Sequence, residues 1–141
     1  MARPLQSLRL RQTIVTTLRA DDDLIALGDP ALSADAETKR IYGRRTPGTL
    51  TWPFLRVNLT DEGPLRKGTE IRGTVHTFSK AQFDDEIEQL NAAVQSALED
   101  AVLELSPATK AYLSWISSQV IHDSAEASAW HGLNSFRATI G

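Results

Sequence analysis

The chain has 141 residues, a hydrophobic content of 41%, no cysteine and a formal net charge of −3 at pH 7. These values are typical of a single globular domain, and we expect one domain over residues 1–141. The lack of cysteine excludes disulfides and thiolate metal sites, and the weakly acidic charge disfavours a general nucleic-acid coat. No stretch has the length of a membrane span or the apolar core of a leader, so we expect a soluble protein that is not exported.

Residues 4–20 are predicted to form the first helix. Pro4 suits the first turn of a helix, because its missing N–H has no partner there in any case. Apolar residues then recur at nearly helical spacing, and they are Leu5, Leu8, Val15 and Leu18. We expect this apolar stripe to face the core.

A dense basic run covers residues 39–45. It could contact phosphate or an acidic partner. Four charges among seven residues, in a chain that is acidic overall, give a weak electrostatic footprint. We therefore favour a short strand at Ile41 and Tyr42 that is flanked by solvated charges.

The next strand is predicted over residues 50–59, with Pro53 near its beginning, where a missing N–H is tolerated. A polar connection with two glycines and charges of both signs follows, over residues 61–69. We expect this connection to form a charged hairpin arm that projects from the body. Such charges are usually solvated, but they can also fix the register of a symmetric assembly.

The centre of the chain is predicted to be a strand that leads directly into a long helix. Alternation places four residues on one face of the strand, and they are Ile71, Gly73, Val75 and Thr77. Ser79 is a good N-cap residue, and Gln82 completes a capping-box pattern. Pro107 marks the end of the helical pattern. We therefore expect one helix over about residues 79–105.

Two further strands are predicted at residues 116–122 and 133–140, whereas residues 109–115 fit either a helical turn or the approach to a strand. In the last strand, Phe136, Ala138 and Ile140 share one face. The expected fold is α+β. A mixed or antiparallel sheet is covered by the helix at about 79–105 and the N-terminal helix at about 4–20, and the charged hairpin arm projects from it.

The sequence carries no phosphate-binding glycine loop and no Gly-x-Ser-x-Gly elbow. His122 and His131 could face each other across a hairpin, with Asp123 beside them, as in a small metal-dependent or His–Asp enzyme. Two histidines on a hairpin are more often independent surface residues, and no pattern links His76 to them. We therefore expect no catalytic residue, cofactor or metal, and this enzyme is the weaker alternative.

Several segments carry a resemblance to a known family: Ile41-Tyr42, Pro53-Phe54-Leu55-Arg56-Val57, Val75-His76-Thr77-Phe78-Ser79 leading into the helical stripe, and Phe136-Arg137-Ala138-Thr139-Ile140. In order and spacing they resemble the tail-terminator family of long-tailed bacteriophages, whose members are often described as tail completion proteins. The polar connection over about residues 28–39 is longer than is usual in that family.

The resemblance implies a structural α+β subunit rather than an enzyme. Such subunits form a ring, in this case a hexamer, that closes the tail tube, ends tube polymerisation and joins the tail to a head-side neck protein. Similar parts occur in gene transfer agents and tailocins. DNA would pass through the lumen without sequence-specific binding, and the protein would be assembled into the virion in the host cytoplasm. A head–tail stopper is an alternative of the same class.

We predict that residues of the arm contact a neighbouring subunit or partner, and these are Asp61, Glu62, Arg66, Lys67 and Glu70. Trp130 lies in an otherwise polar loop of the predicted fold and is a further candidate, as an apolar anchor. Core packing is an equally good explanation of Trp130, since tryptophan is highly buried on average.

Overall fold

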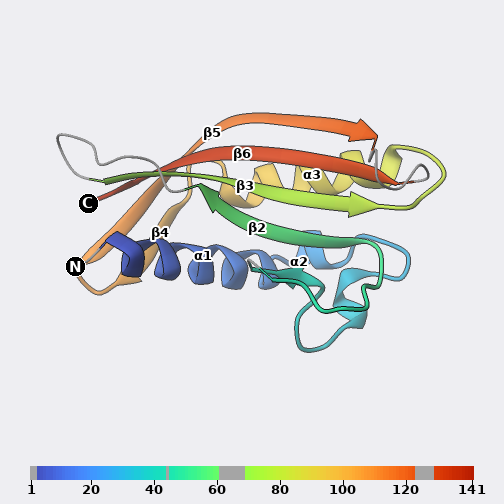
Figure 1. Ribbon diagram of the computed structural model, residues 1–141, viewed down its shortest axis with the longest axis horizontal. Coiled ribbons are helices and arrows are strands. Elements are labelled where there is room, and N and C mark those ends of the chain that lie inside the picture. Colours follow the sequence, from blue (N-terminus) through green and yellow to red (C-terminus); the bar gives the residue numbers. More distant parts are fainter. Residues whose placement is uncertain (1–2, 44, 61–68, 123–128) are drawn as a thin grey trace.

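A computed structural model describes residues 3–43, 45–60, 69–122 and 129–141 (Figure 1). The fold is α+β, as predicted. Its elements in chain order are α1 (Arg3–Arg19), α2 (Asp22–Ile25), the 3-10 helix η1 (Leu32–Ala34), β1 (Ile41–Tyr42), β2 (Phe54–Thr60), β3 (Thr69–Ser79), α3 (Asp85–Leu98), β4 (Val102–Ser106), β5 (Thr109–His122) and β6 (Trp130–Ile140).

The strands form one mixed sheet in the order β1-β2-β3-β6-β5-β4. β1 runs parallel to β2, and every other neighbouring pair is antiparallel. The longest continuous ladder joins β3 to β6, from the pair Thr69 and Ile140 to the pair Ser79 and Trp130. These two strands lie at the middle of the sheet, so their alternating side chains form the centre of both of its faces.

The sheet curls around α1. This helix contacts β2 on one side and β4 on the other, although these strands lie at or near opposite edges of the sheet (Figure 1). α3 packs across β3, β5 and β6, and the three α-helices contact one another. They therefore form one layer on the same face of the sheet. The buried apolar side chains of this layer are Leu10, Ile14, Val15, Leu18, Leu24, Ile87, Leu90, Val94 and Leu98.

The predicted core face of the central strands is confirmed. The residues of β3 that are buried beneath the helices are Ile71, Gly73, Val75 and Thr77. Phe136, Ala138 and Ile140 of β6 share this face, because the register pairs Gly73 with Phe136. A Cβ at Gly73 would lie 2.6 Å from Phe136 Cζ. Glycine is therefore required where the aromatic ring crosses β3.

A small polar network is enclosed between α3 and the sheet. Thr77 Oγ1 donates to Asn91 Oδ1 at 2.6 Å, and Asn134 Nδ2 donates to the same oxygen at 2.8 Å. Asn91 Nδ2 in turn donates to the carbonyl of Gln119 at 3.2 Å. A Cβ at Gly132 would collide with this network. Asn91 therefore ties the helix to three strands of the sheet.

The prediction of one helix over about residues 79–105 is wrong at both ends. β3 continues through Ser79, and α3 begins only at Asp85. The Ser79 hydroxyl does not cap a helix. It accepts from the backbone N–H of Ala81 and donates to Glu86 Oε1, so it stabilises the turn between β3 and α3. The capping-box pattern therefore marks a turn.

At its other end, α3 stops at Leu98, and Val102–Ser106 forms β4, which the sequence analysis missed. Asp100 has a φ of 56°, in the left-handed region that aspartate tolerates better than most residues, and this reverses the chain direction. Residues 109–115, which had two interpretations, belong to β5, and residues 109–112 pair with β4. The apolar residues before Pro107 fit the alternation of a strand as well as the spacing of a helix. Leu103 is buried, whereas Val102 and Glu104 on either side of it are exposed.

The N-terminal helix is confirmed, but its predicted core-facing stripe is wrong at Leu8, which is 38% exposed, and the helix buries Leu10 and Ile14 together with Val15 and Leu18. β1 is also confirmed, but its flanking charges are not all solvated. Arg40 is 2% exposed, and its guanidinium donates to the carbonyls of Pro30 and Trp52. Burial lowers the pKa of Arg40 from its usual value. This side chain therefore holds together the long connection between α2 and β2.

The connection that was predicted to form the charged arm covers residues 61–68, which lie outside the described residues. β2 and β3 are antiparallel neighbours and pair from Phe54 with Phe78 to Thr60 with Arg72. The projecting arm itself stays a prediction.

Candidate functional site

The candidate functional site is the face of the sheet opposite the helices, which we call the outer face. No helix of the described chain packs on it, since α1, α2 and α3 all contact one another on the core face. Strand alternation and register place on the outer face Phe54, Arg56, Glu70, Arg72, His76, Phe78, Glu104, Lys110, Tyr112, Ile121, His131 and Arg137.

One end of the outer face is filled by stacked rings from adjacent strands. Phe54 and Phe78 stack with centroids 4.6 Å apart, and Phe78 stacks on His131 at 4.4 Å. Trp52 packs edge-on against Phe54 at 5.0 Å, and Lys80 Nζ lies 4.6 Å from the Trp52 ring. These contacts bury Phe54 and Phe78, so this end of the face is closed by the chain's own side chains.

Two histidines meet within this cluster. His76 Nδ1 and His131 Nε2 are 2.8 Å apart, so one nitrogen donates a hydrogen bond to the other. Burial, the neighbouring His131 and the guanidinium of Arg56 lower the pKa of His76 to about 4. His76 is therefore neutral at physiological pH and links β3 to β6.

The low pKa of His76 predicts a loss of stability in acid. Above pH 6.5 the residue is neutral in both states, whereas between pH 6.5 and about 4 only the unfolded chain binds the proton. The free energy of unfolding should fall over that interval by about 1–2 kcal/mol, after allowance for screening of a partly exposed group. Urea unfolding at about pH 7 and about pH 4.5 measures this loss, and His76→Gln should reduce it. An unchanged loss in that variant would contradict the assignment.

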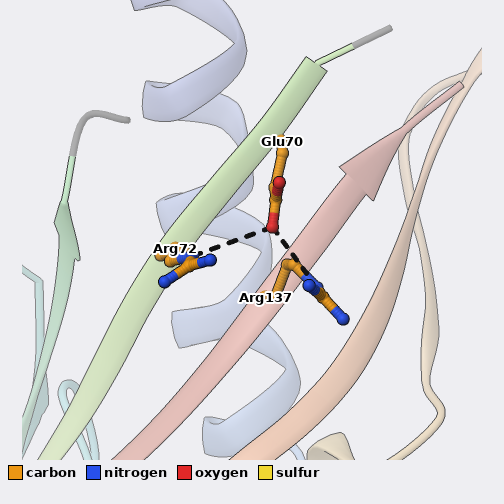
Figure 2. Close-up of polar contacts among 3 residues, drawn as sticks. All are labelled: Glu70, Arg72 and Arg137. Atoms are coloured by element: carbon orange, nitrogen blue, oxygen red, sulfur yellow. Dashed lines mark ion pairs between the residues drawn. The ribbon is translucent and has the colours of Figure 1, made fainter. Parts of the chain in front are cut away.

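The other end of the outer face carries a cluster of charges. Glu70 Oε1 lies 3.3 Å from Arg137 Nε and 3.7 Å from Arg72 Nε (Figure 2). The Glu70 side chain is 14% exposed, while both arginine side chains are about half exposed. Two guanidinium groups thus share one carboxylate, and the cluster has a surplus positive charge that faces solvent.

Large apolar side chains lie beside this cluster on the last strands. Tyr112 and Ile116 are each 50% exposed, and Val102 of β4 pairs with Tyr112. Ile116 falls at the irregularity between Trp115 and Ser117, where the ladder of β5 shifts register. The face therefore combines exposed apolar groups with arginine, a combination that is typical of protein interfaces.

The structure describes only part of the predicted contact set. Asp61, Glu62, Arg66 and Lys67 lie outside the described residues, and Glu70 forms the ion pairs of Figure 2. Trp130 is the first residue of β6 and is not in a loop. Its indole N–H donates to the Ala81 carbonyl at 3.2 Å, and its side chain packs against the core cluster. A partner contact of either residue remains a prediction.

The enzyme alternative requires His122 and His131 to face each other, and the register of the described strands contradicts this. In the ladder of β5 and β6, His122 lies opposite Trp130 and His131 lies opposite Ile121, so positions 122 and 131 are on different faces. Asp123 lies outside the described residues. His131 instead meets His76, which no local sequence pattern indicates, because the contact depends on β3 pairing with β6.

Over the described ranges, no group of three or more histidine, cysteine, aspartate or glutamate side chains could hold a metal ion. None of the helices in that part of the chain is long and apolar enough to span a membrane.

The fold and the outer face define a structural α+β protein with a surface suited to contacts between proteins. The sequence model of the family "Tail completion protein gp17" matches residues 13–141, and the chain belongs to this family. It is therefore a structural component of a phage or phage-like virion tail, and the family is not known as an enzyme. The resemblance inferred from the sequence is confirmed.

Solved structures share the fold. A chain from the "virion of native gene transfer agent (GTA) particle" is 21% identical, with a TM-score of 0.73 over 99% of this chain and 98% of that chain. A second solved chain is 13% identical, with a TM-score of 0.61 over 100% of this chain and 96% of that chain. No curated protein has a significant match.

Proposed function

We propose that the protein is a tail terminator. Six copies form a closed ring on the last ring of the tail tube, end tube polymerisation and join the tail to a head-side neck protein. The observation that supports this proposal is the family match over residues 13–141, together with a fold shared over almost the full length with a chain of a gene transfer agent virion. The chain acts as one domain, and DNA passes through the lumen without sequence-specific binding.

The proposed ring needs surfaces that meet a neighbour. The outer face is one such surface, because exposed apolar residues and half-exposed arginines lie together on it. The arm residues Asp61, Glu62, Arg66 and Lys67, with Glu70 at the start of β3 and Trp130 at the start of β6, are proposed as further subunit or partner contacts.

The native mass tests the ring. We expect a species of six 15.5 kDa chains, about 93 kDa, in native mass spectrometry or light scattering over a range of concentrations. Added to polymerising tail-tube protein, the ring should shorten the tubes. Replacing Arg66 and Lys67 together with glutamate should weaken the ring, whereas replacing the exposed Arg45 with glutamate should not.

A chain that remains a monomer at every concentration and leaves tube length unchanged would contradict the proposed function. An oligomer that is unaltered by the double substitution would remove the arm from the contact set and leave the ring in place.

A further inference from the structure

We propose that the ring closes by contact between unlike surfaces: the outer face of one copy binds the α3 surface of the next copy. This inference rests on the proposed function, since it names the partner of the outer face within the same ring. Its first support is the charge of α3. From position 84 to 100 the chain has six acidic residues and no lysine or arginine, and they are Asp84, Asp85, Glu86, Glu88, Glu99 and Asp100.

The acidic residues of α3 face solvent. All of them are exposed except Glu86, and within the described chain no lysine or arginine forms an ion pair with the exposed ones. The helix itself explains only part of this charge. Carboxylates of the first turn favour the positive end of the helix dipole, but Glu99, at the C-cap, lies at its negative end. Phe83, which is 67% exposed, adds an apolar group beside the acidic turn.

The outer face has the opposite charge. Its described strands carry Arg56, Arg72, Lys110 and Arg137 against Glu70 and Glu104, a surplus of two positive charges in a chain whose net charge is −3. The surplus is concentrated where Arg72 and Arg137 share the carboxylate of Glu70 (Figure 2). A carboxylate of a neighbouring copy would complete this cluster, because a guanidinium binds carboxylates through paired N–H donors.

These two surfaces require a head-to-tail contact. α3 covers the core face of the sheet, so the acidic surface and the outer face lie on opposite sides of the molecule. A two-fold contact through either surface would place like charges against each other. A contact between unlike surfaces instead repeats from copy to copy and forms a ring when the rotation closes. Phe83 on one copy and the exposed Tyr112 and Ile116 on the next supply apolar area.

A charge-swap experiment tests the contact. In the α3 variant, Asp84→Lys, Asp85→Lys, Glu88→Lys and Glu99→Lys make the acidic surface basic, since only Glu86 and Asp100 stay acidic. In the face variant, Lys110→Glu and Arg137→Glu make the outer face acidic and leave Arg72 to pair with Glu70. Each variant alone should shift the concentration for half-assembly upward at least about tenfold, because like charges then meet across the contact. An equimolar mixture should assemble again, since each surface then meets its opposite.

The restored ring should contain the two variants in equal numbers, which native mass spectrometry resolves by their masses. Glu37→Lys with Arg45→Glu, at exposed positions that belong to neither surface, is the control and should assemble like the wild type. Far-UV circular dichroism checks that each variant folds. If the face variant does not fold, Ile116→Glu replaces it and should also weaken assembly.

The outcomes separate this inference from the proposed function. If both variants form the ring as well as the wild type does, the head-to-tail contact is overturned but the ring is not. If both variants are impaired and their mixture also remains unassembled, the pairing of the two surfaces is overturned. If the face variant still assembles but no longer binds tube protein, the pairing is overturned as well, and the outer face contacts the tube. A wild-type chain that never assembles, and that also leaves the length of the tubes unchanged, would contradict both proposals.

Discussion

Replacing Asn91 with leucine should lower the free energy of unfolding by about 3 kcal/mol. The Asn91 side chain is buried, and its amide joins Thr77, Asn134 and the carbonyl of Gln119. Leucine removes these bonds, so polar groups on the sheet lose their partners where water has little access. Each such group costs about 1–3 kcal/mol, and the added apolar burial offsets part of that cost. Urea unfolding measures the difference.

Gln89→Leu is the matched control for this prediction. Gln89 is on the same helix and is exposed, so the same type of change should alter stability by less than about 0.5 kcal/mol. Equal stability of the Asn91 variant and the wild type would show that the network contributes nothing to folding.

A second large loss is expected from Phe136→Ala, which should lower the free energy of unfolding by about 4 kcal/mol. The ring is fully buried beneath the helices and crosses β3 at Gly73, where the side chain of Leu59 from β2 also packs. Neighbouring backbone cannot collapse into the vacated volume without breaking the ladder between β3 and β6, so we expect a cavity to remain. The unfolding midpoint in urea reports the loss.

Thr139→Ala is the control on the same strand. Thr139 is exposed and lies on the opposite face of the sheet, so its truncation should cost less than about 0.5 kcal/mol. A loss in Phe136→Ala of under about 1 kcal/mol would mean that the core can repack around Gly73.

The sequence predicted the elements whose pattern is long and periodic. The core face of β3 and the face of β6 that carries Phe136 follow from local spacing alone, because burial of one face imposes it. The N-terminal helix was predicted too, but not its buried face, since Leu10 and Ile14 are buried and Leu8 is exposed. The extent of α3 did not follow in this way. Val102, Leu103 and Leu105 fit a helix as well as a strand, and only pairing with β5 decides between them.

Contacts between distant strands account for the part of the site that local patterns missed. The pair His76 and His131 forms because β3 lies beside β6, which no spacing within either strand specifies. Arg40 illustrates the same limit for burial. Among basic neighbours it suggests a solvated charge, yet the surrounding loops supply two carbonyl acceptors and enclose it.

The two edges of the sheet have a consequence for how the protein can assemble. β1 has only two residues, and β4 has five residues with a break in register between Glu104 and Ser106. Such edges present few unpaired backbone groups in line, so a foreign strand has little on which to extend the sheet. Copies of the chain are therefore poor templates for fibre growth, as suits a protein whose proposed place is the end of a polymer.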